Sequence, residues 1–142
     1  MILQEKVQDE VRELWQDLRV PVEVRFYGQD GDASANATMR TLWQELQALT
    51  PLLAFSESQS PLPRFLPERE NEREGPISEL WVQGSFTGIR YLGIPSGHEF
   101  GGLIDTVRSL STETAPQINA ETRTLLEQLQ DDLHLEVFVT PT

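Results

Sequence analysis

The sequence contains no cysteine. This absence excludes a disulfide framework, a thiolate zinc site and any thiol nucleophile within the 142 residues. Positive charge is also scarce, with 11 basic residues against 23 acidic ones and a formal net charge of −12. Such a surface repels phosphate backbones, so a nucleic-acid partner is not expected.

Long apolar runs are missing as well. The N-terminus turns polar after Leu3, without the apolar core of a signal peptide. No run approaches the ~18 residues that a membrane span needs. We therefore expect a cytoplasmic protein with no membrane partner. Its hydrophobic fraction of 38% and its length suffice for one domain core without a metal or a disulfide.

The periodicity of apolar residues predicts alternating helices and strands. Helices are expected over 2–18, 34–49, about 100–110 and 119–129, and strands over 20–27, 52–55, 77–82, 88–92 and 133–139. Segment 56–75 contains three prolines and a charge run at 68–74, which predicts a mobile surface loop. This order is typical of an α/β domain.

Two segments resemble a known family. Residues 88–100 read Gly-Ile-Arg-Tyr-Leu-Gly-Ile-Pro-Ser-Gly-His-Glu-Phe. They resemble the matching stretch of protein disulfide oxidoreductases with two tandem thioredoxin-like units, and are similar to the N-terminal region of the flavoprotein subunit of alkyl hydroperoxide reductase. Residues 135–142, Leu-Glu-Val-Phe-Val-Thr-Pro-Thr, resemble the strand that leads into the Cys-Pro-Tyr-Cys motif of the second unit in those oxidoreductases.

The resemblance implies an α/β, thioredoxin-like (glutaredoxin-like) fold. A mixed four-stranded sheet would be flanked by helices, with an extra N-terminal helix and a C-terminal helix plus strand. Residues 1–111 would form a thioredoxin-like unit, and residues 112–142 the connecting helix and first strand of a truncated second unit. The implied partner is that second unit or a redox partner protein, and the strand at 133–139 suggests a homodimer as a further possibility.

The resemblance also locates a redox site. It places the first unit's Cys-x-x-Cys motif over residues 33–36, where Ala33 and Asn36 occupy the cysteine positions. Disulfide exchange needs a low-pKa thiolate at a helix N-terminus and a second thiol within reach, so these positions are vestigial. The family's cis-proline, which faces the motif, corresponds to Pro76.

Other polar residues receive structural interpretations. Ser96 and Glu99 have the spacing of a capping box, in which each side chain bonds the other residue's amide, and this accounts for His98-Glu99 without catalysis. His134 is expected to be exposed on the last strand. Two distant histidines make no zinc pattern, and we expect neither a metal nor a cofactor.

Two functions remain open. The chain is interpreted first as the redox-inactive N-terminal unit of a thiol–disulfide oxidoreductase, which reduces protein disulfides or a peroxiredoxin through cysteines beyond residue 142. The alternative is a free-standing, non-catalytic interaction module with the same fold. In both cases the chain by itself is not expected to be an enzyme.

Overall fold

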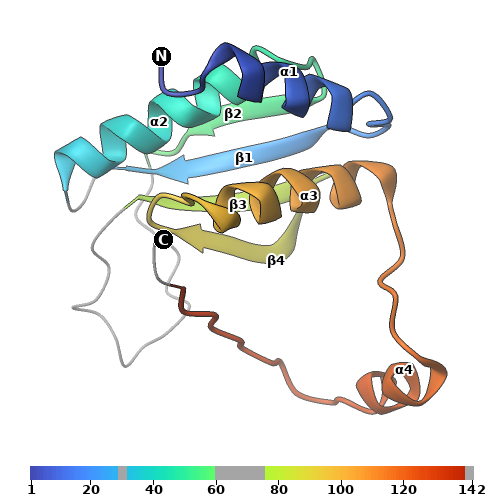
Figure 1. Ribbon diagram of the computed structural model, residues 1–142. Helices are drawn as coiled ribbons and strands as arrows, with labels where there is room; N and C mark the ends of the chain where they lie inside the picture. The colour runs from blue at the N-terminus through green and yellow to red at the C-terminus, as the bar shows by residue number, and fades with distance from the viewer. Residues whose placement is uncertain (29–31, 60–75, 140–142) are drawn as a thin grey trace.

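The computed structural model describes residues 1–28, 32–59 and 76–139. Its elements follow one another as α1 (Glu5–Leu14), β1 (Val22–Tyr27), α2 (Ala33–Gln47), β2 (Leu53–Glu57), β3 (Ile77–Val82), β4 (Ser85–Leu92), α3 (His98–Thr112) and α4 (Ala120–Glu127) (Figure 1). The four strands form one sheet in the order β2-β1-β3-β4. β1 pairs with β2 in parallel and with β3 antiparallel, and β3 pairs with β4 antiparallel, so the sheet is mixed.

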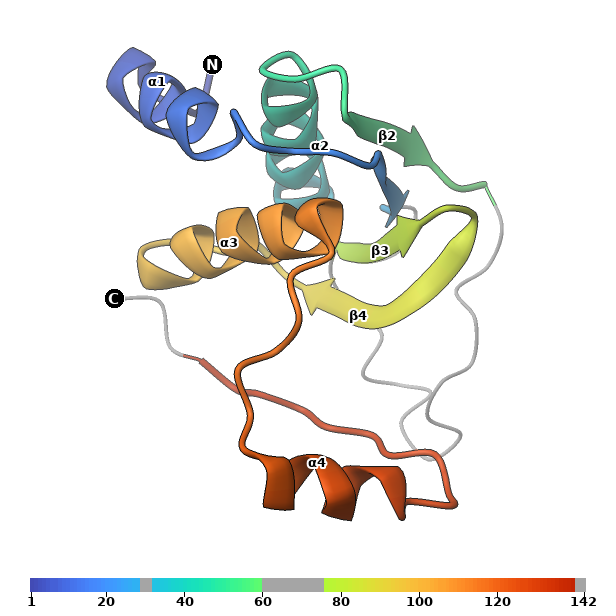
Figure 2. The ribbon, with the colours of Figure 1, turned by 90° about the vertical axis from the view of Figure 1, so that its right-hand side faces the viewer.

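The alternation along β1 decides which face of the sheet is buried. Val22, Val24 and Phe26 are fully buried, whereas the intervening residues are only half-buried. Since successive side chains of a strand point to opposite faces, the buried set lies on one face. The core cluster joins these three side chains to residues of α1, α2 and α3, so the three helices cover this face, and Figure 2 shows them on one side of the strands.

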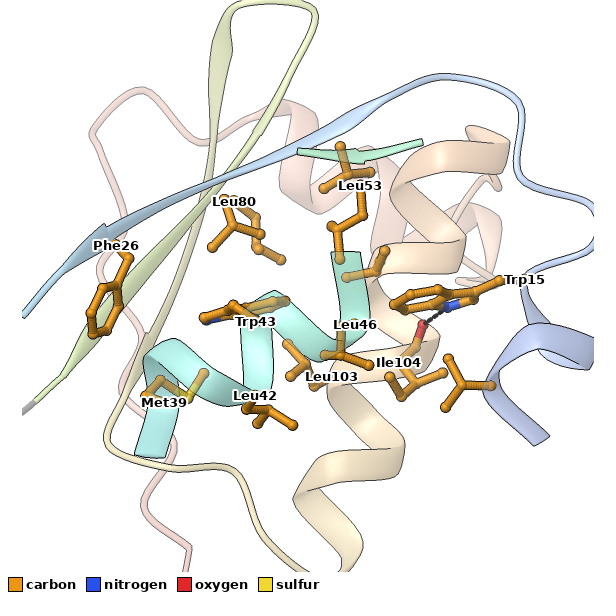
Figure 3. Packing of buried hydrophobic residues seen from close by; sticks show 14 of the residues in the cluster. Trp15, Phe26, Met39, Leu42, Trp43, Leu46, Leu53, Leu80, Leu103 and Ile104 are labelled. Carbon is orange, nitrogen blue, oxygen red and sulfur yellow. Dashed lines mark hydrogen bonds between the residues drawn. The ribbon is translucent and has the colours of Figure 1, made fainter. Parts of the chain in front are cut away.

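Two tryptophans anchor helices within this core (Figure 3). Trp15 follows α1, and its indole N–H donates to the backbone carbonyl of Ile104 in α3 at 3.1 Å. Trp43 of α2 is fully buried and donates to the Ser78 hydroxyl in β3 at 2.8 Å. A buried indole needs an acceptor, and each of these bonds fixes how its helix lies on its neighbour.

The C-terminal part of the described chain stays outside the core. α4 is capped by Asn119, whose side chain accepts from the Thr122 amide at 2.7 Å, but α4 has no buried residue. The strand predicted over 133–139 is wrong, because these residues are extended without being a strand of the sheet. A strand forms only where a neighbouring strand offers backbone partners, and this segment runs past the β4 side of the molecule without joining the sheet (Figures 1 and 2).

Two predicted boundaries also shift. The loop predicted over 56–75 begins later, since Ser56 and Glu57 pair with Arg25 and Phe26 and thereby extend β2. The rest of that prediction, over 60–75, lies outside the described residues. The hairpin's return strand begins at residue 85 rather than 88. Residues 87–89 of β4 lie opposite the single residue 80 of β3, and this bulge lets β4 continue past its glycine at φ 86°. Within the described ranges, no helix is both long enough and apolar enough to span a bilayer.

Candidate functional site at the start of helix α2

Helix α2 begins where the resemblance places the redox motif. Asp32 is the N-cap: its carboxylate accepts from the Ser34 amide at 2.8 Å, and its carbonyl accepts from the Asn36 amide at 2.9 Å. Ala33 is therefore the first helical residue, and Asn36 lies one turn further on. The side-chain cap explains why the helix starts here, since it satisfies an amide that the helix itself leaves without an acceptor.

The two motif positions have different exposure. Ala33 is exposed, whereas Asn36 is only 4% exposed and belongs to the buried residues of α2. An attacking thiol must be reachable by a partner's disulfide, and a second thiol beside it can be shielded. The first of the two predicted motif positions is thus exposed and the second shielded, and they carry a methyl group and an amide. Neither group can act as the nucleophile of disulfide exchange.

Pro76 lies close to the same end of the sheet. It directly precedes Ile77, which pairs with Tyr27, the last residue of β1, so it lies at the end of β1 from which the chain continues toward α2. Pro76 is buried, and its carbonyl accepts from the Gly93 amide at 2.8 Å. The bond that precedes it involves residue 75, outside the described residues, so the cis conformation stays a prediction.

An ion pair occupies the surface beside the first turns of α2. The Arg40 guanidinium donates to both carboxylate oxygens of Glu57 at 2.8 and 2.6 Å, and this lowers the pKa of Glu57 below its ordinary value. The guanidinium also lies 5.6 Å from the centroid of the Phe26 ring. The ring in turn leaves no space at Gly28, where a Cβ would come within 2.5 Å of a ring carbon. These contacts pack the region and provide no reactive group.

The capping box predicted at residues 96–99 is wrong. α3 begins at His98, and its N-cap is Gly97, with φ 57° and no side-chain cap. The Glu99 amide instead bonds the backbone carbonyl of Ser96 at 3.2 Å. The helix starts one residue later than the capping box requires, from a glycine at positive φ, so the Ser96 hydroxyl no longer lies at the capping position. The Glu99 Oε1 atom is buried without a hydrogen-bond partner among the described residues.

The sheet face opposite α1, α2 and α3 carries a polar cluster that the sequence pattern did not predict. Its centre is Glu79 of β3, which is 1% exposed. Its carboxylate accepts from Arg90 at 2.8 Å, from the Trp81 indole at 3.1 Å and from the Tyr27 hydroxyl at 3.3 Å. Arg25 completes the cluster, with its guanidinium 3.5 Å from the centroid of the Trp81 ring.

The cluster explains how a carboxylate remains buried. Charge-assisted bonds offset much of its desolvation cost, as a buried charge requires. Burial, together with the Glu79 charge, raises the pKa of Tyr27, so the phenol remains a donor. One sequence signal was available: Glu79 alternates with Ile77 and Trp81 on the same face of β3, where an acidic residue needs a partner. The raised pKa keeps the Tyr27 phenol protonated, and Arg90 already pairs with the carboxylate, so the cluster serves structure.

His134 agrees with the expectation of exposure on the chain's C-terminal segment. Its side chain is 45% exposed, and its Nε2 lies 3.0 Å from a carboxylate oxygen of Glu136. In the ranges that the structure describes, no three histidine or acidic side chains converge as metal ligands would.

The topology defines the class of protein. A mixed sheet of order β2-β1-β3-β4, with a crossover helix that starts at the C-terminal end of a central strand, is a thioredoxin-like fold. The comparisons with solved structures confirm this class. The chain superimposes on the AhpF component of the alkylhydroperoxide reductase of Enterococcus faecalis with a TM-score of 0.69 and 21% identity, covering 91% of this chain and 62% of that one.

Two further relatives bear out the predicted resemblance. A protein disulfide oxidoreductase from Aeropyrum pernix matches with a TM-score of 0.64 and 22% identity, over 91% of this chain and 56% of that one. In sequence, the same component of alkyl hydroperoxide reductase in Staphylococcus aureus is 27% identical over 120 residues, which are 84% of this chain and 21% of the relative. The chain therefore spans about a fifth of the length of that curated relative. No protein-family model matches it.

Proposed function

We propose that this chain is the redox-inactive N-terminal thioredoxin-like unit of a thiol–disulfide oxidoreductase. The observation that carries the proposal is the first turn of α2, where Ala33 and Asn36 take the two motif positions at a well-formed helix start. The backbone that would activate a thiolate is retained, but the chain has no thiol. The unit then contributes structure and contact surface, while the exchange reaction takes place elsewhere.

The two ends of the described chain support a second unit. α1 is followed by β1, and α4 is followed in the same way by the alternating apolar segment 133–139. In the first case the helix and strand belong to one core, whereas α4 and 133–139 lack a core of their own. A helix followed by an extended apolar segment, without a sheet to join, is what the opening of another thioredoxin-like unit would provide.

The whole protein's activity follows from this proposal. Its relatives are a component of alkyl hydroperoxide reductase and a protein disulfide oxidoreductase. We infer that the full-length protein reduces protein disulfides or a peroxiredoxin through a Cys-x-x-Cys motif beyond residue 142, in the cytoplasm. The partner of the present unit is then the second unit or a redox protein.

A free-standing interaction module is the second candidate. The exposed leucines of α4 favour it, because an apolar helix face of this kind can bind another protein. In this case the fold is kept for binding, and no redox motif follows in the reading frame. A homodimer through residues 133–139 belongs to this candidate as well.

The reading frame after the codon for residue 142 separates the two functions. A Cys-x-x-Cys motif in frame directly after it supports the oxidoreductase, and a stop codon supports the module. An insulin-reduction assay with dithiothreitol tests the inactive site independently. The 142-residue chain should give the rate of the buffer control, and turnover above that rate would overturn the claim that the unit is inactive.

A further inference from the structure

Residues 133–139 present a row of apolar side chains to solvent. Leu133, Leu135 and Val137 are 63%, 77% and 85% exposed, and Phe138 and Val139 are 81% and 57% exposed. The odd-numbered residues of the segment are all apolar, so one face of the extended chain would be apolar throughout. An extended segment with this pattern is suited to being added as a strand at a sheet edge.

The sheet has one regular edge, formed by β2. All five of its residues pair with β1 in an unbroken parallel register. The Leu52 carbonyl and the Ser58 amide both bond to β1, so the backbone groups of the even-numbered residues point toward β1. The backbone groups of the odd-numbered residues, Leu53, Phe55 and Glu57, therefore point away from the sheet. Among these residues no proline, lysine or bulge protects the edge, and the one charge, on Glu57, is already neutralised by Arg40.

The opposite edge, formed by β4, is irregular. Its pairing with β3 is interrupted between residues 79 and 81, and Gly88 has a φ of 86°. The Thr87 hydroxyl donates to the Leu80 carbonyl at 2.8 Å within this irregular stretch. A bulge of this kind breaks the straight row of backbone groups that an added strand requires. β4 is therefore a poor acceptor.

We propose that residues 133–139 of one copy of the 142-residue chain add as a strand to β2 of a second copy, and that the exchange is reciprocal. The figures favour a second copy over the same chain, since 133–139 runs along the β4 side of the molecule and β2 lies at the other edge of the sheet (Figures 1 and 2). In a two-fold dimer, residues 133–139 of each copy pair with β2 of the other copy, so the apolar rows of both copies are removed from water.

Charge determines how this dimer responds to salt. Each copy carries a formal net charge of −12, so two copies repel each other over distances comparable to the Debye length. The contact itself is nearly uncharged, since 133–139 has a single acidic residue, Glu136. Added salt screens the repulsion without weakening an apolar contact, and the dimer should be tighter at high ionic strength.

The dimer is an inference about the 142-residue chain by itself, since in a longer protein the proposed second unit would use residues 133–139 as its own first strand. The reading frame decides whether a second unit exists, whereas the oligomeric state of the 142-residue chain decides whether β2 accepts the strand. A chain followed by a Cys-x-x-Cys motif and a chain followed by a stop codon give the same expectation for the isolated 142 residues.

The test is light scattering of the 142-residue chain over a range of concentrations, at low and at high salt. We expect a reversible dimer that is tighter at high salt. The double variant Leu135→Lys/Val137→Lys should weaken it by about tenfold or more. The matched control Gln128→Lys/Gln130→Lys adds the same charge next to the segment and should leave the dimer intact. Neither variant touches the core, so folding is retained in both.

Amide hydrogen exchange locates the acceptor edge. In the dimer, the amides of Leu53, Phe55 and Glu57 should exchange more slowly than in dilute monomer, while those of β4 should not change. A synthetic peptide of residues 131–139, added in excess, should return the dimer to monomer. A monomer at all concentrations, a dimer that survives the double variant, or protection on β4 in place of β2 would each overturn the proposal.

Discussion

The indole N–H of Trp43 donates to the hydroxyl of Ser78 at 2.8 Å, and both residues are fully buried. The bond joins α2, the helix on which the family resemblance places the redox-motif positions, to β3, the strand that follows Pro76. The two parts of the candidate site are thus held together by one buried polar contact. Its strength can be measured directly.

We expect Ser78→Ala to lower the free energy of unfolding by about 1–3 kcal/mol, because the indole N–H would remain buried without its acceptor. Urea unfolding measures the loss. Ser85→Ala, at an exposed serine in β4, is the matched control and should change little. In a Trp43→Phe background the cost of Ser78→Ala should be much smaller, and an equal cost in both backgrounds would contradict the role given to the bond.

Restoring two thiols should restore a redox site. In the variant Ala33→Cys/Asn36→Cys, the first cysteine takes the first position of α2, where the helix N-terminus lowers a thiol pKa below its usual ~8.5. We expect an intramolecular disulfide on oxidation and measurable insulin reduction. Each single variant should lack both properties. Failure of the double variant to form the disulfide would show that the turn at residues 33–36 does not have the thioredoxin-like geometry.

The caps of α2 and α3 should respond differently to mutation. Asp32→Ala removes a bond to the Ser34 amide and should cost about 1 kcal/mol of stability. Ser96→Ala removes no side-chain cap, since α3 starts from Gly97, and should change stability by less than about 0.5 kcal/mol. Thermal unfolding of the two variants side by side tests this pair. A large loss in Ser96→Ala would restore the capping box that the sequence predicts.

Glu45 should make stability depend on pH. Its carboxylate accepts from the amides of Ile2 and Leu3, both at 2.7 Å, and lies 3.5 Å from the terminal ammonium. Burial acts to raise the pKa of Glu45, but the two amides and the ammonium outweigh it, and the pKa lies below its ordinary value of 4.5. The unfolded chain therefore takes up the proton first as the pH falls, and the stabilisation is present above about pH 4.5 and lost below it.

Melting temperatures between about pH 6 and pH 3 measure this effect. Glu45→Gln should lower the free energy of unfolding by about 1 kcal/mol at neutral pH. Its melting temperature should also fall less steeply than that of the parent chain as the pH is lowered. Glu10→Gln, at an exposed glutamate of α1, is the control and should keep the slope of the parent chain. If the melting temperature of Glu45→Gln falls with pH as steeply as that of the parent chain, Glu45 is not the source of the pH dependence.

Much of the fold follows from local sequence pattern. The alternation of Val22, Val24 and Phe26 gives β1 one buried face, and the spacing of Met39, Trp43 and Leu46 gives α2 its buried stripe. These periods are properties of a strand and a helix, so the elements can be predicted without tertiary contacts. The motif-like stretch at 88–100 then predicts the thioredoxin-like class, which the solved relatives confirm.

The absence of cysteine decides the chemistry from composition alone, because disulfide exchange needs a thiolate and no arrangement of these residues supplies one. Only the tertiary structure decided the rest. A strand exists only beside another strand, so 133–139 could not be judged from its own alternation. A buried carboxylate persists only where distant donors meet it, and Glu79 finds Tyr27 and Arg90 solely because β1 and β4 both pair with β3.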